Sequence, residues 1–300
     1  MNTGIHWLRA FRLRTLPLAL ASIAMGGFLA YKANAFRWDI FLLCILTTVF
    51  LQILSNLAND YGDAVHGADH VDRKGPARAV QSGLIKPARM RRAIRLFAFL
   101  SLTSGLLLLW VAFGFQWRAV LFFLALGLLS IGAAVTYTIG RKPYGYLGLG
   151  DLSVFVFFGL VGVMGSYYLF TKSVSAYEVL PALSMGLLSV AVLNVNNIRD
   201  IESDRVAGKY SIPVRLGRRR AIVYHWILLS FAILFACLYT VFKFQTPLQL
   251  IFILALPLFF RNGMAITRKP PELLDPYLKQ MALATLLFAL LFGTGIIIHS

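Results

Sequence analysis

Two short polar segments, each at the end of a long apolar run, combine asparagine with aspartate at helical spacing. In the first, Asn56, Asp60 and Asp63 close the apolar run 40–58. Residues three and four positions apart lie on one face of a helix, so these side chains converge. Two carboxylates held together repel each other unless a cation or a proton lies between them. Oxygen ligands of this kind suit Mg²⁺, which binds one or two carboxylates together with substrate phosphate.

The second segment closes the apolar run 179–195 and repeats this arrangement. Asn196, Asp200 and Asp204 are spaced four residues apart, so they also share one helix face. We predict that the two segments face each other across one site. The four aspartates are the predicted catalytic metal ligands, and the asparagines Asn56 and Asn196 support them. One aspartate at the end of an apolar run would need no explanation, but two such clusters indicate a function.

Basic residues accompany both acidic segments. A metal held by carboxylates and surrounded by lysine or arginine is typical of a diphosphate site. The metal bridges phosphate to carboxylate, and the cations neutralise the remaining oxygens. The candidates for diphosphate binding are Arg73, Lys74, Arg78, Lys142 and Lys209, and Lys209 is also a predicted catalytic residue. The alternative for each is a role in membrane topology or in binding anionic lipid headgroups.

The composition indicates what kind of chain carries these segments. Of the 300 residues, 59% are hydrophobic and 14% are charged, and the mean hydropathy is +0.74. Soluble domains of this length and disordered chains are less apolar. We therefore expect an all-α polytopic membrane protein. The two cysteines, Cys44 and Cys237, lie in apolar runs and indicate packing positions, not a disulfide framework or a metal site.

Nine apolar runs approach the roughly 20 residues that a membrane-spanning helix needs. The expected spans are 16–32, 38–59, 96–115, 119–139, 152–171, 178–198, 222–242, 247–264 and 280–298. We interpret the first as a spanning helix and not as a cleaved signal peptide. The eighth is the weakest, because it is short and contains Pro257. We expect a single membrane domain, 1–300, with cap segments at about 60–95, 138–151 and 198–221.

The positions of the basic residues predict the topology. The net charge is +17, from 29 basic and 12 acidic residues, and 24 of the basic residues fall in alternate segments between the spans. The five on the other side are Lys32, Arg37, Arg118, Lys172 and Lys243. Because positive charge collects on the cytoplasmic side, we expect a cytoplasmic N-terminus, a C-terminus on the opposite side and two cytoplasmic acidic segments. This placement of charge also argues against a nucleic-acid partner.

Three further residues are candidates for contact with a second substrate. Asp151 follows a glycine-rich loop and starts the fifth span, where it is either a helix cap or a third carboxylate of the site. Tyr137 and Gln81 are the other two candidates. His66 and His70 lie close to the first acidic segment, but imidazole is a poor ligand for Mg²⁺, so a solvated loop is the simpler interpretation.

Taken together, these motifs resemble the UbiA-type intramembrane prenyltransferase superfamily over nearly the whole chain. Within it, the chain looks like the branch that prenylates 1,4-dihydroxy-2-naphthoate in bacterial menaquinone synthesis. The segments that carry the resemblance are 56–63, 75–78, 81–85, 145–151 and 196–209. Two positions differ from the pattern. Asp151 stands where a glutamate is expected, and Gly67 stands where a third acid is expected, so either Asp69 or Asp72 takes its place or the motif uses two acids.

The resemblance implies a central cavity that opens to the cytoplasmic side, Mg²⁺ as the cofactor and a specific reaction. A polyprenyl group passes from an all-trans-polyprenyl diphosphate to 1,4-dihydroxy-2-naphthoate, CO₂ and diphosphate are lost, and demethylmenaquinone forms. Lys209 matches a lysine of the superfamily that meets the diphosphate. The implied location is the bacterial inner membrane. Membrane lipids are the other expected partners, and no obligatory protein partner is expected.

Two alternatives remain open at this point. The same chemistry on another aromatic acceptor, such as 4-hydroxybenzoate, is the nearer one. The alternative of another class is a transporter whose carboxylates carry ions or protons. Transporter sites usually lie near the bilayer midplane on broken helices, whereas these acids lie at helix ends. The segment 67–83, rich in glycine and proline, is the candidate for a lid that orders on substrate binding.

Overall fold

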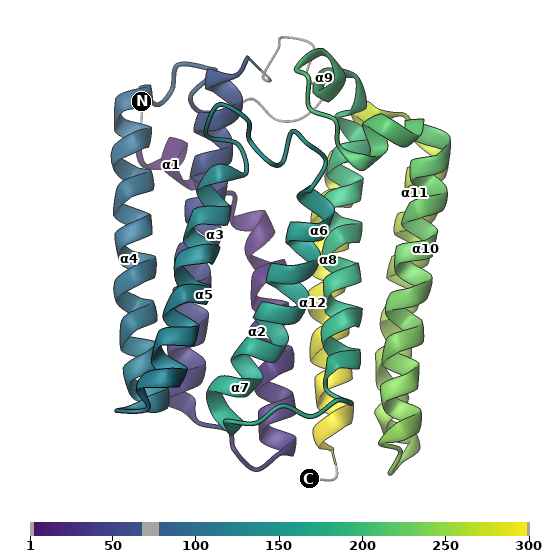
Figure 1. The fold of residues 1–300 in the computed structure, drawn as a ribbon. Coiled ribbons are helices and arrows are strands. Elements are labelled where there is room, and N and C mark those ends of the chain that lie inside the picture. The colour runs from purple at the N-terminus through teal and green to yellow at the C-terminus, as the bar shows by residue number, and fades with distance from the viewer. Residues whose placement is uncertain (1–2, 68–77, 299–300) are drawn as a thin grey trace.

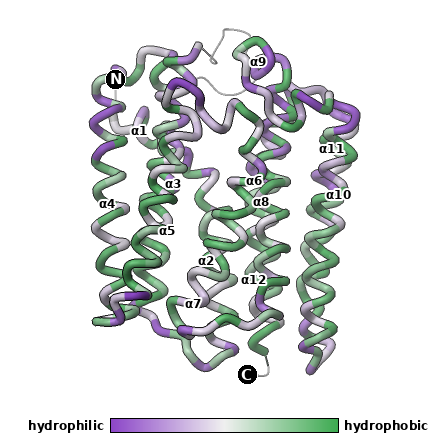
Figure 2. The backbone as a smooth tube through the Cα atoms, in the orientation of Figure 1, coloured by the Kyte–Doolittle hydropathy of each residue, from purple (hydrophilic) through white to green (hydrophobic). Residues whose placement is uncertain are grey.

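The computed structural model of the chain describes residues 3–67 and 78–298, and this part of the chain forms a bundle of long helices without strands (Figure 1). Nine helical segments of these residues are long and apolar enough to cross a membrane. Hydrophobic residues fill the middle of the bundle, and hydrophilic residues gather toward its ends (Figure 2). The predicted fold class and number of spans are confirmed.

The first five spans run from α1 to α7. The first consists of α1 (Thr3–Phe11), η1 (Leu13–Thr15) and α2 (Leu16–Lys32). The next three are α3 (Trp38–Val65), α4 (Pro87–Phe113) and α5 (Trp117–Thr136). The fifth is built from α6 (Gly150–Val154), the π-helical segment η2 (Phe155–Gly165) and α7 (Ser166–Thr171).

The last four spans run from α8 to α12. The sixth is α8 (Val179–Arg199), which is followed by the short helix α9 (Ile201–Val206). The seventh is α10 (Ile212–Phe242), and the eighth joins the 3₁₀ helix η3 (Pro247–Ala255) to α11 (Leu256–Arg268). The ninth is α12 (Asp275–Ile297), preceded by η4 (Pro271–Leu273).

Several helices extend beyond the expected spans. α3 continues to Val65, so Asp60 and Asp63 lie in its last turns and not in a loop. α4 and α10 begin well before the apolar runs that they contain. Backbone hydrogen bonds close within a helix, so a helix continues past the apolar region wherever water can solvate its side chains. In the eighth span, Pro257 lies in the first turn of α11, where its missing N–H is not needed.

The helices form two groups around a middle layer (Figure 1). α3, α4 and α5 lie on one side, α8, α10 and α11 lie on the other, and α2 with α6 and α7 lies between them. η2 approaches α8 closely: a Cβ added to Gly159 would lie 2.8 Å from the Cα of Gly186. A core cluster that includes Ile53, Leu57 and Met90 joins α1, α3 and α4. A larger cluster joins most of the other spans.

Both acidic segments lie at the same end of the bundle, which we call the motif end. α3 and α8 end there, and the N-terminal helix α1 is at that end as well (Figure 1). The C-terminal end of α12 lies at the opposite end. This arrangement brings the first and second acidic segments together, as the sequence predicts.

Candidate active site

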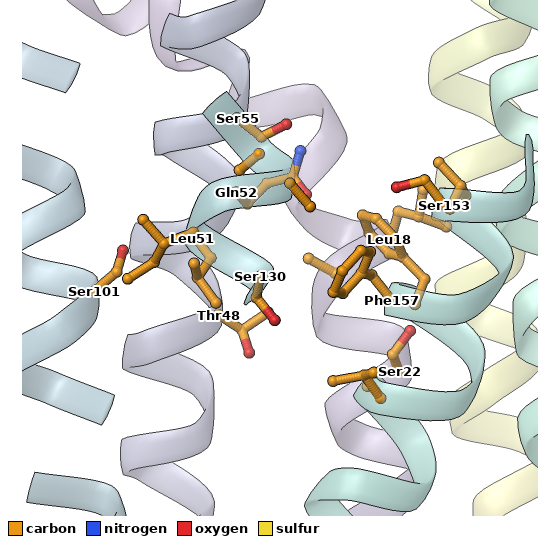
Figure 3. Close-up of a pocket in the computed structure, with 18 of the residues that line it drawn as sticks. Leu18, Ser22, Thr48, Leu51, Gln52, Ser55, Ser101, Ser130, Ser153 and Phe157 are labelled. Carbon is orange, nitrogen blue, oxygen red and sulfur yellow. The ribbon is translucent and has the colours of Figure 1, made fainter. Parts of the chain in front are cut away.

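A cavity of about 390 Å³ lies among α2, α3, α4, α5, η2 and α8. It is polar at the motif end, where its lining includes Asn56, Asn59, Asp63, Arg78, Asn196, Asn197, Arg199 and Lys209. Its deeper part is lined by apolar side chains interspersed with small hydroxyl groups, such as Leu51, Phe157, Ser22 and Ser130 (Figure 3). A polar end joined to an apolar interior fits a ligand with a charged head and a long apolar tail.

Cations outnumber carboxylates among the described residues that line the polar end of the cavity. Among the described lining residues there are five cations, Arg12, Arg14, Arg78, Arg199 and Lys209, and one carboxylate, Asp63. Fixed cations in a water-poor site attract an anion more strongly than exposed cations do. Four of these cations also pair with carboxylates at or behind the cavity wall. The cavity surface therefore presents mainly cationic groups, which suit an anionic ligand such as a diphosphate.

The first acidic segment is held by contacts from distant parts of the chain. The two carboxylate oxygens of Asp60 accept hydrogen bonds from the backbone N–H groups of Ala79 and Val80, each at 3.0 Å. Asp63 forms an ion pair with Arg78 and accepts a hydrogen bond of 2.8 Å from the hydroxyl of Tyr146. Burial, and then Asp63 itself, raises the pKa of Tyr146, so the phenol stays protonated and donates.

The second acidic segment is held mainly by its own neighbours. Arg199 donates to both carboxylate oxygens of Asp200, at 2.8 and 2.7 Å. The same guanidinium reaches Asp275 at the start of α12, at 2.6 Å. Asp275 also binds Arg14, at 2.8 Å. This chain of charges joins the end of α8 to α12 and to η1, and two of its arginines line the cavity.

Asp204 and Lys209 form a buried ion pair at 3.3 Å. Burial alone would lower the pKa of Lys209, but the carboxylates of Asp204 and Asp63 outweigh it and raise that pKa. The ammonium therefore stays charged at the cavity surface. Burial raises the pKa of Asp204 to about 6, an effect that Lys209 opposes. Lys209 thus lies between the two acidic segments, where the sequence predicts a diphosphate-binding cation.

The two predicted asparagine ligands are both engaged in hydrogen bonds. Asn56 donates to the backbone oxygen of Phe11 at 2.9 Å and to the hydroxyl of Thr15 at 3.1 Å. Asn196 accepts a hydrogen bond of 2.9 Å from Arg199. The neighbouring Asn197, which sequence reasoning did not single out, is buried and lines the cavity.

Two oxygens at this end of the bundle fit a hard cation. Oδ2 of Asp204 and Oδ1 of Asn197 are buried and accept no hydrogen bond from the residues that the structure describes. Buried oxygens without a donor are costly, and a divalent cation would satisfy them. Within the described residues, no three acidic, histidine or cysteine side chains come close enough to hold a metal by themselves. A metal here would take its other ligands from a bound substrate or water, as Mg²⁺ commonly does.

The predicted acceptor contacts lie in different places. Tyr137 lines the cavity. Asp151 does not belong to the described lining; it is buried and accepts a hydrogen bond of 2.9 Å from Tyr224 of α10. Lys142 and Gln81 are exposed and also lie outside the described lining. The predicted diphosphate contacts Arg73 and Lys74, and the acids Asp69 and Asp72, fall outside the described residues.

The sequence alone did not predict the roles of several residues of the site. Arg199 lies inside the second acidic segment, but its role depends on reaching Asp275, which is 76 positions away. Tyr146 is part of the glycine-rich loop, and only the fold brings its hydroxyl to Asp63. An arginine directly beside an aspartate was the one local signal available for Arg199.

The chain is similar to known membrane prenyltransferases. The model of the UbiA prenyltransferase family matches residues 19–286. A 1,4-dihydroxy-2-naphthoate octaprenyltransferase of Haemophilus influenzae is 46% identical over 97% of this chain and 96% of its own length. The protein of the same name from Escherichia coli is 45% identical over 97% of this chain and 94% of its own length.

Solved structures show the same fold at lower identity. A UbiA homologue from Aeropyrum pernix matches with a TM-score of 0.67 at 18% identity, over 93% of this chain and 97% of that one. A UbiA homologue from Archaeoglobus fulgidus, solved with DMAPP and Mg²⁺, matches with a TM-score of 0.64 at 18% identity, over 98% of this chain and 99% of that one. At this level of identity the likeness concerns the fold.

Proposed function

The chain belongs to the UbiA prenyltransferase family, and on this premise we propose that it transfers the polyprenyl group of an all-trans-polyprenyl diphosphate to 1,4-dihydroxy-2-naphthoate. CO₂ and diphosphate leave, and demethylmenaquinol forms, the hydroquinone that oxidation converts to demethylmenaquinone; this is a step of menaquinone biosynthesis. The observation that carries this proposal is the high identity, over nearly the whole of both chains, to naphthoate octaprenyltransferases. The cavity, with cations at one end and an apolar interior, supports it.

The cations at the motif end bind the diphosphate. Lys209, Arg78 and Arg199 line the cavity there, and each is paired with a carboxylate of the two acidic segments. A bound diphosphate therefore meets charges that are already in place, so little reorganisation is needed when negative charge develops on the leaving group. Arg73 and Lys74 remain proposed helpers.

Mg²⁺ is the proposed cofactor. Asp60, Asp63, Asp200 and Asp204 are the proposed carboxylate ligands, with Asn56 and Asn196 supporting, and the unpartnered oxygens of Asp204 and Asn197 favour a hard cation at this end. When bound, Mg²⁺ supplies Lewis-acid stabilisation of the negative charge on the leaving diphosphate.

The reaction needs no strong base from the protein. The allylic C–O bond breaks and its electron pair leaves with the diphosphate. The ring carbon that bears the carboxylate then attacks the allylic carbon. Loss of CO₂ returns the bonding pair of the carboxylate to the ring and restores its aromaticity, so no ring proton has to be removed. The apolar walls of the cavity keep water away from the allylic cation and hold the tail of the prenyl group.

The family and the nine apolar helices favour a multi-pass protein of the bacterial inner membrane. The distribution of basic residues, 24 on one side and five on the other, supports a cytoplasmic N-terminus and an opposite C-terminus. Both substrates would then reach the motif end from the cytoplasmic side. Reporter fusions to the two termini test this orientation: a C-terminal fusion active in the cytoplasm would contradict it.

A paired acceptor assay tests the proposed activity. Membranes that contain the protein receive a polyprenyl diphosphate, Mg²⁺ and either 1,4-dihydroxy-2-naphthoate or 4-hydroxybenzoate, with and without a chelator. We expect demethylmenaquinol, detected as demethylmenaquinone after oxidation in air, from the naphthoate alone and no product with the chelator or with the Asp63→Ala variant. Product from 4-hydroxybenzoate only would contradict the acceptor assignment, and product in the presence of chelator would contradict the metal.

A further inference from the structure

Gln52 is a polar residue of the cavity that has no part in binding the diphosphate. It lies on α3, one helical turn deeper in the membrane than Asn56, and lines the cavity. Figure 3 shows it facing the cavity, with Leu18 and Phe157 on the opposite side. A glutamine within a membrane span is costly, and such residues usually serve a function.

A hydrogen-bond network fixes how the amide of Gln52 is oriented. The hydroxyl of Thr15 donates its one hydrogen to the backbone oxygen of Arg12 at 3.0 Å, so it accepts all its other hydrogen bonds. The Asn56 nitrogen donates to the backbone oxygen of Phe11 at 2.9 Å and to Thr15 at 3.1 Å. Because a backbone oxygen can only accept, this assignment of the Asn56 amide is fixed, and its oxygen is an acceptor.

The orientation of Gln52 follows from these neighbours. Its nitrogen donates to Thr15 at 3.2 Å and to the oxygen of Asn56 at 3.4 Å. Both amide hydrogens of Gln52 are then used. Its carbonyl oxygen accepts no hydrogen bond from the residues that the structure describes. The side chain therefore presents an acceptor without a donor to the cavity.

Only one part of the two substrates suits this oxygen. The prenyl tail has no polar atom, and the diphosphate is an anion that a carbonyl oxygen would repel. The ligand must instead carry an O–H donor on a body with apolar faces, because the facing side chains Leu18 and Phe157 are apolar. A hydroxylated aromatic ring has both properties.

We propose that the carbonyl oxygen of Gln52 accepts a hydrogen bond from a ring hydroxyl of the aromatic acceptor and thereby selects hydroxylated naphthoates. This inference rests on the proposed function and adds a specificity residue to it. The acceptor ring lies at the level of Gln52, one turn deeper than Asn56 of the first acidic segment, and the prenyl tail continues deeper. A buried acceptor left without its donor penalises a ring that lacks the hydroxyl.

The test measures binding of acceptor analogues to wild-type protein and to the Gln52→Leu variant, with polyprenyl diphosphate as the second substrate. The probes are 1-hydroxy-2-naphthoate and 4-hydroxy-2-naphthoate, each of which lacks one hydroxyl. In the wild type we expect one of them to bind about tenfold more weakly than the dihydroxy compound. In Gln52→Leu this difference falls to near unity, the KM for 1,4-dihydroxy-2-naphthoate rises about tenfold, and the KM for the prenyl diphosphate does not change.

Two further variants separate recognition from structure. Gln52→Glu keeps an acceptor oxygen, and in the protonated form that burial favours it keeps one donor toward Thr15, so it retains the discrimination between the analogues. Gln280→Leu removes another glutamine of a membrane span, one that lies outside the described cavity lining and donates to the backbone oxygen of Leu258 at 2.9 Å. It lowers thermal stability but leaves the KM for the acceptor unchanged.

Clear outcomes would overturn the proposal. An unchanged preference between the analogues in Gln52→Leu would contradict it, and so would equal increases in the KM values of both substrates. If Gln52→Leu fails to fold, loss of the discrimination in Gln52→Glu would contradict the proposal in its place. A wild-type protein that does not prenylate the naphthoate would instead contradict the proposed function, so the two failures are distinguishable.

Discussion

The two acidic helix ends look alike in sequence, yet the structure holds them in different ways. At the end of α3, Asp60 and Asp63 are held by Ala79, Val80 and Tyr146, which belong to other segments. At the end of α8, Asp200 is held by its neighbour Arg199. The first end is therefore ordered by the loops around it, whereas the second forms most of its contacts within its own segment. Two similar sequence motifs are thus held in place by different kinds of contact.

The difference bears on function, because the two ends also present different groups to the cavity. Asp63 is the carboxylate of the first end that lines the cavity, whereas the second end presents Arg199 and Lys209. One end thus contributes a carboxylate and the other contributes cations. A ligand that combines a metal with a diphosphate needs both carboxylates and cations. This explains why two helix ends that present different groups meet at one site.

The largest effect is expected from Asp63→Ala. This change removes the one carboxylate among the described lining residues of the cavity. It also leaves the buried guanidinium of Arg78 without its ion pair to Asp63. We expect prenyl transfer to fall by at least about 100-fold, the usual cost of losing an electrostatic group of an active site. Turnover in membranes measures it. Asp39→Ala, at an exposed pair with Arg37, is the matched control, and equal turnover of the two variants would remove Asp63 from the active site.

Lys209→Met and Arg78→Met each remove the buried cation that pairs with a carboxylate of one acidic segment. Together they compare how much stability each segment gains from that cation. Lys209 is the cation paired with Asp204, so its removal should cost about 3 kcal/mol of unfolding free energy. Arg78→Met should cost less, about 1–2 kcal/mol, because the Tyr146 hydroxyl still donates to Asp63. Unfolding of the two variants in detergent measures both values. The reverse order would show that the second end does not depend mainly on contacts within its own segment.

Asp60→Asn tests whether the main role of Asp60 is to accept hydrogen bonds from the backbone N–H groups of Ala79 and Val80 and so hold that segment in place. Asparagine has one oxygen that can still accept from Ala79 or Val80, so we expect a loss of activity of about tenfold, well below that of Asp63→Ala. Turnover of Asp60→Asn beside Asp60→Ala measures this. A loss as large as that of Asp63→Ala would instead indicate that Asp60 is as important to the metal or the substrate as Asp63 is, and that anchoring is not its main role.

The smallest effect is expected from Tyr146→Phe. The change removes one hydrogen bond to Asp63 but leaves the ion pair with Arg78. We expect stability to fall by about 1 kcal/mol and turnover by a few-fold at most. Thermal unfolding and turnover are measured beside Tyr31→Phe, an exposed tyrosine. A 100-fold loss of turnover would mean that the Tyr146 hydroxyl acts on the substrate itself.

Local spacing predicted much of this architecture. The nine spans and the shared end of the two acidic segments could be predicted from the chain, because apolar runs and helical periodicity are properties of neighbouring residues. The predicted ends of the helices were less accurate than their number and order. α3 and α10 continue into polar sequence, where hydropathy no longer marks a boundary.

The sequence by itself determined a nine-span membrane protein with two acidic helix ends beside basic residues, because hydropathy and spacing are local. The tertiary structure decided the partners. Asp63 meets Arg78 and Tyr146, Asp151 accepts a hydrogen bond from Tyr224 outside the described cavity lining, and Asp275 joins Arg14 to Arg199. These pairs lie far apart in the chain. A buried charge takes whichever partner the packing of the helices brings within reach.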